Sequence, residues 1–164
     1  MVVLASGVDR SSHRQKGEGM NFAIWCVIFT FLNCLDLVTT HAGMHNLPAD
    51  EMQKKEMNPF MSGIIANRPL SWAIKLAMGG VIVAVSVLAR KSDPEEALLV
   101  IVALSIALVL TVINNIHATW ATKHHRLSLG KLLTEKLHFS KTLAYFCLVG
   151  SILGLSFVIA SSLY

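Results

Sequence analysis

Apolar residues are gathered into four long blocks, at residues 21–42, 70–89, 97–120 and 142–164. Each block is close to the roughly 20 residues that a helix needs to cross a membrane. Helices satisfy their backbone hydrogen bonds internally, as lipid requires. We therefore expect an all-α, polytopic integral membrane protein. Residues 1–20 are expected to form a polar N-terminal tail, and residues 21–164 a four-helix transmembrane bundle.

Signals at the ends of the blocks support these helices. Pro69 falls in the first turn of the second block, and the acidic run at residues 93–96 precedes the third. Between the first two blocks, Asn58-Pro59 predicts a short helix over residues 59–66. Residues 127–137 predict an amphipathic segment at the membrane interface, in which Lys131 and Lys136 oppose the leucines. Those leucines are Leu127, Leu129, Leu132, Leu133 and Leu137.

Four crossings place both termini on the same side of the membrane. The loops at residues 43–68 and 122–141 then share the opposite side, which we call the long-loop side. It carries eight Lys and Arg residues, against five on the side of the termini. The positive-inside rule therefore favours a cytoplasmic long-loop side, although the basic N-terminal tail argues the other way.

The composition sets the expected partners. The chain is 54% hydrophobic and 15% charged, with a net charge of +4. Because the basic residues lie beside apolar blocks, membrane lipids are the expected partners rather than nucleic acid. In the fourth block, Gly150 and Gly154 have the GxxxG spacing that permits close helix contact. This favours packing against a neighbouring helix, either within the chain, in another copy or in another membrane subunit.

Two charged residues lie inside the apolar blocks, and they are the first candidates for function. Asp36 lies six residues before the end of the first block, and Lys75 five residues after the start of the second. At about 1.5 Å per residue, both lie roughly 8–9 Å below the long-loop side. Asn115 in the third block has about the same depth. We expect Asp36 and Lys75 to pair, with Asn115 nearby as a hydrogen-bond partner.

Other polar residues extend this layer along the same helix faces. Asn33, Asp36 and Thr40 are spaced by three to four residues, as are Thr111, Asn115 and Thr119. Such stripes should face protein or water rather than lipid. The expected buried polar cluster comprises Asn33, Asp36, Thr40, Lys75, Asn114 and Asn115. The cluster serves either as a structural ion pair or as a site for an ion, proton or small polar ligand.

Histidines suggest a second kind of chemistry near the same surface. His41 and His45 are four residues apart, and His117 lies in the third block. With Asp36 or Glu56 they form a candidate site for a divalent metal. The alternative is a set of interfacial histidines without a metal, because Gly43 interrupts the helix between the first two.

The order of these polar residues resembles a family of small prokaryotic integral membrane proteins whose function is uncharacterised. Its pattern is N-x-x-D-x-x-x-T in the first span, then E-x-N-P, then Lys in the second span and Asn late in the third. The matching residues are Asn33, Asp36, Thr40, Glu56, Asn58, Pro59, Lys75, Asn114 and Asn115. The resemblance covers roughly residues 20–120. It implies a shared buried polar site that includes Glu56 and Asn58, and no activity.

Three functions remain open at this point. The first is an accessory or assembly subunit of a membrane complex, consistent with the small size and the absence of a catalytic motif. The second is an ion- or proton-coupled transport component that uses Asp36, Lys75 and Glu56. The third is an intramembrane metal-dependent enzyme that uses the histidines.

Overall fold

The computed structural model describes residues 9–124 and 128–163, with side chains from Asn21 onward. Within that part of the chain the regular elements are helices, and the predicted all-α class is confirmed. The elements are α1 (Asp9–Ala42), α2 (Ala49–Lys55), α3 (Pro59–Ser62), α4 (Arg68–Ala89), α5 (Pro94–Lys123), α6 (Leu129–Lys131), the π-helical turn η1 (Leu132–Lys136) and α7 (Lys141–Ser162).

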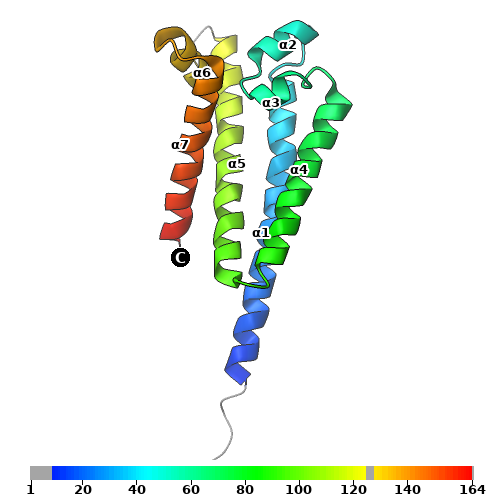
Figure 1. Cartoon of the computed structure of the whole chain (residues 1–164), viewed down its shortest axis with the longest axis vertical. Coiled ribbons are helices and arrows are strands. Elements are labelled where there is room, and N and C mark those ends of the chain that lie inside the picture. Colours follow the sequence, from blue (N-terminus) through cyan, green and yellow to red (C-terminus); the bar gives the residue numbers. More distant parts are fainter. Residues whose placement is uncertain (1–8, 125–127, 164) are drawn as a thin grey trace, which may run out of the picture.

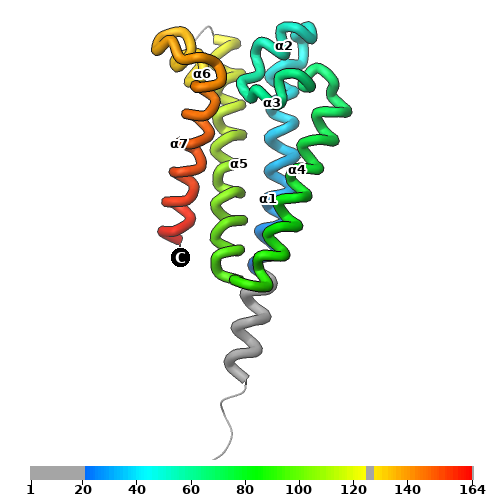
Figure 2. Tube along the Cα trace, viewed as in Figure 1, coloured from blue at the N-terminus to red at the C-terminus, as the bar shows by residue number. Residues whose placement is uncertain are grey.

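Four helical segments are long and apolar enough to cross a membrane. They are Asn21–Ala42 within α1, and the whole of α4, α5 and α7. The four run side by side, and the short elements α2, α3 and α6 gather at one end of the bundle (Figure 1). The chain is thus a multi-pass helical membrane protein. The Asn21 end of the first span and the C-terminal end of α7 point in the same direction (Figure 2).

Several bounds differ from those expected. α1 begins at Asp9, inside the stretch expected to be a tail. No proline interrupts residues 9–20, and a helix extends with one hydrogen bond for each added residue. α3 ends at Ser62, short of residue 66. The amphipathic segment forms α6 and η1, while Leu127 and the first eight residues of the tail lie outside the described residues.

Side-chain caps explain where the other helices begin. Asn58 accepts a hydrogen bond from Phe60 N at 3.0 Å, and Asn67 accepts one from Leu70 N at 3.2 Å. The Asp93 carboxylate accepts from the backbone of both following glutamates, at 3.1 and 2.9 Å. Ser140 caps α7 through Leu143 N at 3.2 Å. Each cap satisfies an N–H group that the helix itself leaves unpaired.

α5 is the central helix, and α1, α4 and α7 pack against it. α7 lies on the opposite side of α5 from α4 (Figure 1). The buried apolar core lies where α1 and α7 meet the first half of α5. Its members are Phe22, Phe29, Ala97, Leu98, Ile101, Val102, Ala103 and Ala160. This core fixes the helices at one end, and the polar residues lie toward the other end.

Candidate functional site

An ion pair joins α1 to α4 in the half of the bundle nearer the short helices. The Lys75 ammonium donates to Asp36 Oδ2. Asp36 is 4% exposed, and the Lys75 side chain is 24% exposed. Asn115 Nδ2 of α5 donates to Asp36 Oδ1 at 2.8 Å. Each carboxylate oxygen therefore has its own donor, and the predicted buried ion pair is present.

Asn33 and Thr40 extend this layer along α1. Asn33 Nδ2 donates to the Lys75 carbonyl oxygen at 3.3 Å, which adds a second link between α1 and α4. Thr40 Oγ1 accepts from Asn115 Nδ2 at 3.1 Å and donates to the Asp36 carbonyl at 2.8 Å. Because the cost of an unpaired polar group in lipid is high, these links hold the three helices in one register.

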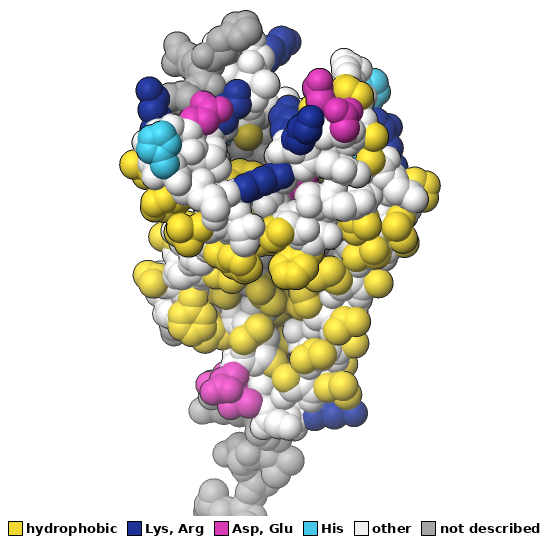
Figure 3. All heavy atoms as spheres, turned by 45° about the horizontal axis from the view of Figure 1, so that its top comes forward, with side chains coloured by type: hydrophobic (Ala, Val, Ile, Leu, Met, Phe, Trp, Pro, Cys, Tyr) yellow, Lys and Arg dark blue, Asp and Glu magenta, His cyan; other side chains and the backbone are white. Residues whose placement is uncertain are grey.

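A cavity of about 670 Å³ lies beside this layer. Small-molecule sites typically occupy about 300–1,000 Å³. Its polar lining includes Asp36, Thr40, Glu56, Asn58, Lys75, Asn114 and Asn115, and its apolar lining includes Leu37, Leu108, Leu148, Val149 and Ile152. Figure 3 shows basic side chains around a hollow at this end of the molecule. The cavity thus combines a polar upper part with an apolar wall.

Glu56 and Asn58 enter the cavity lining from the segment between α2 and α3. A Glu56 carboxylate oxygen accepts from Asn58 N at 2.8 Å. Burial raises the pKa of the Glu56 carboxyl above its ordinary value of 4.5, although the Asn58 N–H and the charges of Lys75 and Lys141 oppose the shift. Burial therefore makes the Glu56 carboxyl easier to protonate than an ordinary exposed glutamate.

Asn114 differs from its neighbour Asn115. It is half-buried and lines the cavity, yet its amide makes no hydrogen bond to the described residues. The Nδ2 group of Asn115, in contrast, donates to both Asp36 and Thr40. The Asn114 amide is therefore available, as both donor and acceptor, to a molecule in the cavity.

The histidines considered as metal ligands are not brought together, so the candidate metal site is not supported. His41 Nε2 lies 3.0 Å from Ser71 Oγ between α1 and α4. His45 follows the end of α1 and contacts Asn46 Oδ1 at 2.6 Å, because the helix ends at Ala42 and no longer aligns it with His41. His117 is exposed. The described residues contain no group of three potential ligands that could hold a metal.

Gly150 and Gly154 face away from the other described helices. A Cβ atom placed on either glycine would meet no described atom within 4 Å. α7 instead buries Ala144, Ser156 and Ala160, and it packs against α5. Ser156 and Ala160 have the small-xxx-small spacing that would have predicted this face.

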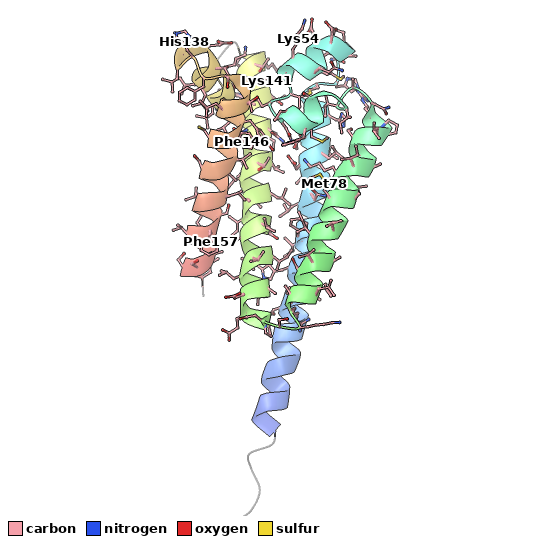
Figure 4. The ribbon with its side chains drawn as sticks, viewed as in Figure 1. Lys54, Met78, His138, Lys141, Phe146 and Phe157 are labelled. Atoms are coloured by element: carbon pink, nitrogen blue, oxygen red, sulfur yellow. The ribbon has the colours of Figure 1, made fainter. Side chains whose placement is uncertain are left out.

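The cavity mouth contains lysines that were expected only as part of the basic loops. Lys55, Lys131 and Lys141 all line the cavity, from α2, α6 and α7 respectively. Lys141 Nζ donates to the carbonyls of Gln53 and Lys54, at 3.0 and 2.9 Å, and so links α7 to the end of α2 (Figure 4). The three lysines come from segments that are far apart in sequence and come together only in the folded chain. Their spacing in the sequence therefore did not indicate that they line one cavity.

The fold and the site together define a multi-pass helical membrane protein with a polar layer and a cavity at one end. Residues 27–123 match the family described as "Domain of unknown function (DUF5658)", and the chain belongs to that family. This confirms the expected membership of an uncharacterised family. No curated protein and no solved structure matches the chain.

Proposed function

We propose that the protein binds a small molecule in the cavity beside the Asp36–Lys75 pair. The observation that carries this proposal is the 670 Å³ volume, which has both polar groups and an apolar wall. Such a combination is typical of small-molecule sites, where apolar surface supplies affinity and a few polar groups fix orientation. The free Asn114 amide supports the proposal, because it faces the cavity without a partner among the described residues.

The ion pair itself suits a framework role. Each Asp36 oxygen already accepts from one donor, Lys75 or Asn115, and the Lys75 charge balances the carboxylate, which weakens its attraction for a cation. For this reason the geometry favours ligand binding over the ion- or proton-coupled transport considered from the sequence. The intramembrane metalloenzyme has no support from the described histidines.

Native mass spectrometry of the protein purified in mild detergent tests this function. We expect an additional bound mass that is lost in Val149→Trp, because Val149 lines the cavity. Val158→Trp is the matched control, since Val158 is on the same helix but is 65% exposed on its surface. Absence of a bound mass in the wild type, or equal loss in both variants, would contradict the proposal.

A second role follows from the outer face of α7. Gly150 and Gly154 leave a strip without side chains, and the adjacent Leu153 and Phe157 are exposed. Small residues let a second membrane helix approach closely. We infer that the protein acts as an accessory or assembly subunit, in contact with another membrane subunit or a second copy through this face.

The same proposal includes an orientation. Both termini lie on one side of the membrane, and the cavity opens on the long-loop side. The excess of lysine and arginine in the two long loops favours the cytoplasm for that side. The cavity would then be filled from the cytoplasm or from the cytoplasmic leaflet.

A further inference from the structure

The charges around the cavity are unbalanced. Five lysines and three acids line it. The opposite charges of Asp36 and Lys75 cancel, because these two residues form an ion pair. Lys54 lies 3.7 Å from Asp50 on the outer surface. The lining lysines are Lys54, Lys55, Lys75, Lys131 and Lys141, and the acids are Asp36, Glu56 and Glu135.

Two lysines at the mouth, Lys55 and Lys131, come close enough for their like charges to interact. Lys55 comes from the last turn of α2 and Lys131 from α6, and both side chains line the cavity. Partial burial and the nearby charge of Lys131 lower the pKa of the Lys55 ammonium. Lys55 Nζ donates to the Gly43 carbonyl at 2.9 Å, and the hydrogen bonds of Lys141 Nζ to described residues likewise go to backbone carbonyls. An anion placed here would relieve the repulsion and accept from these ammonium groups.

The apolar wall extends from this mouth into the membrane. Ile152 lies eleven residues after Lys141 on α7, a distance of about 16 Å at 1.5 Å per residue. Half of the hydrocarbon core of a bilayer is about 15 Å. Leu108, Leu148 and Val149 lie along the same wall. The wall therefore covers the depth of roughly one leaflet.

We propose that the cavity binds an anionic amphiphile with one hydrocarbon chain. Its phosphate or carboxylate head lies between Lys55 and Lys131, and its chain lies along Leu108, Val149 and Ile152. This inference rests on the proposed ligand-binding function and adds the chemical class of the ligand. The amphiphile comes either from the membrane or from solution, since both sources present the same head and chain.

Native mass spectrometry of the delipidated full-length protein mixed with dodecyl phosphate tests this chemical class of ligand. The comparison ligands are dodecyltrimethylammonium, monododecanoylglycerol and inorganic phosphate. We expect one bound dodecyl phosphate, with an affinity at least about tenfold above that of the other three. A second experiment distinguishes a ligand taken from the membrane from one taken from solution. The protein is mixed with vesicles that contain a lysophospholipid with a phosphate head, and transfer of that lipid to the protein indicates the membrane as the source.

Variants at the mouth locate the head. Lys55→Gln with Lys131→Gln should weaken dodecyl phosphate binding about tenfold, whereas Lys123→Gln with Lys136→Gln should leave it unchanged, because neither of these exposed lysines lines the cavity. The reversal Lys55→Glu with Lys131→Glu should instead favour dodecyltrimethylammonium. All four positions are exposed, so the variants should fold.

Three results would overturn this inference. Equal binding of all three amphiphiles, if it is sensitive to Val149→Trp, would refute the anionic head and leave the ligand-binding function intact. Inorganic phosphate that binds as tightly as dodecyl phosphate would refute the chain. Binding of dodecyl phosphate that is unaffected by Val149→Trp would place the amphiphile outside the cavity.

Discussion

Gly79 of α4 lies directly against the Asn33 amide of α1. A Cβ atom at Gly79 would be 2.5 Å from Asn33 Nδ2, so the absence of a side chain lets Asn33 reach the Lys75 carbonyl. The adjacent Gly80 has open space at the same position. The two neighbouring glycines thus have different roles, one at a helix contact and one on the surface of α4.

Gly79→Ala should therefore destabilise the protein by about 1–3 kcal/mol, because a helix or the Asn33 side chain must move. Gly80→Ala should be neutral or stabilising by up to about 1 kcal/mol, since alanine is the better helix former. Unfolding in a series of denaturing detergent concentrations measures both. Equal effects of the two substitutions would show that the Gly79–Asn33 contact is unimportant.

Breaking the ion pair from either side should be costly. Asp36→Asn and Lys75→Met each leave a partner uncompensated in a buried site, a loss of about 3–5 kcal/mol in soluble analogues. The double variant should recover much of that loss. A double-mutant cycle on detergent unfolding checks this, and purely additive losses would mean that the two side chains do not interact.

Glu56 should make stability depend on pH. Its raised folded-state pKa means that the folded protein retains this proton to higher pH than the unfolded chain. Stability should fall as pH rises from the ordinary value of 4.5 through the raised pKa, and then level off. Glu56→Gln should lose this part of the pH profile, as measured by thermal melting. Glu51→Gln on the exposed face of α2 is the control, and parallel profiles for wild type and Glu56→Gln would refute the prediction.

The proposed topology can be tested with single cysteines. The background is a variant in which Cys26, Cys34 and Cys147 have been replaced. In it, Ser92→Cys should be labelled by a membrane-impermeant reagent added on one side of the membrane, and Gln53→Cys by the same reagent added on the opposite side. Ser92 follows α4 and Gln53 lies in α2, at opposite ends of the bundle. Labelling of both from one side would contradict four crossings.

The outer face of α7 gives the fifth prediction. Gly150→Leu and Gly154→Leu should not change the stability of the single chain, because open space surrounds both positions. They should weaken association with other subunits or a second copy, which size-exclusion chromatography with light scattering can measure. Ser156→Leu is the contrast: Ser156 is buried, so that variant should destabilise the chain itself. Unchanged association in both glycine variants would remove the assembly role.

The polar layer could be predicted from the sequence because depth in a membrane helix follows from residue counting. Asp36, Lys75 and Asn115 lie at one depth from the long-loop side, and the cost of a lone charge requires that they meet. The relative positions of the histidines could not be predicted in this way. Their placement depends on where α1 ends, and that end at Ala42 separates His45 from His41.

The cavity could not be predicted, because its walls come from segments that are distant in sequence. Lys55 and Lys131 belong to different loops, and no periodicity relates them. The GxxxG motif indicated contact but not which face of α7 makes it. Ser156 and Ala160 meet the bundle, so Gly150 and Gly154 are left outside.

The family match ends at residue 123, and so includes the polar layer but not α7. One long wall of the cavity, from Lys141 to Ile152, thus lies beyond the part that defines the family. Under the proposed ligand-binding function, substitutions in that wall would change which hydrocarbon chain fits without disturbing the Asp36–Lys75–Asn115 links. The proposed head-group contacts at Lys55 and Lys131 would stay in place, so the chain preference would be set on α7 separately from the register of the other three helices.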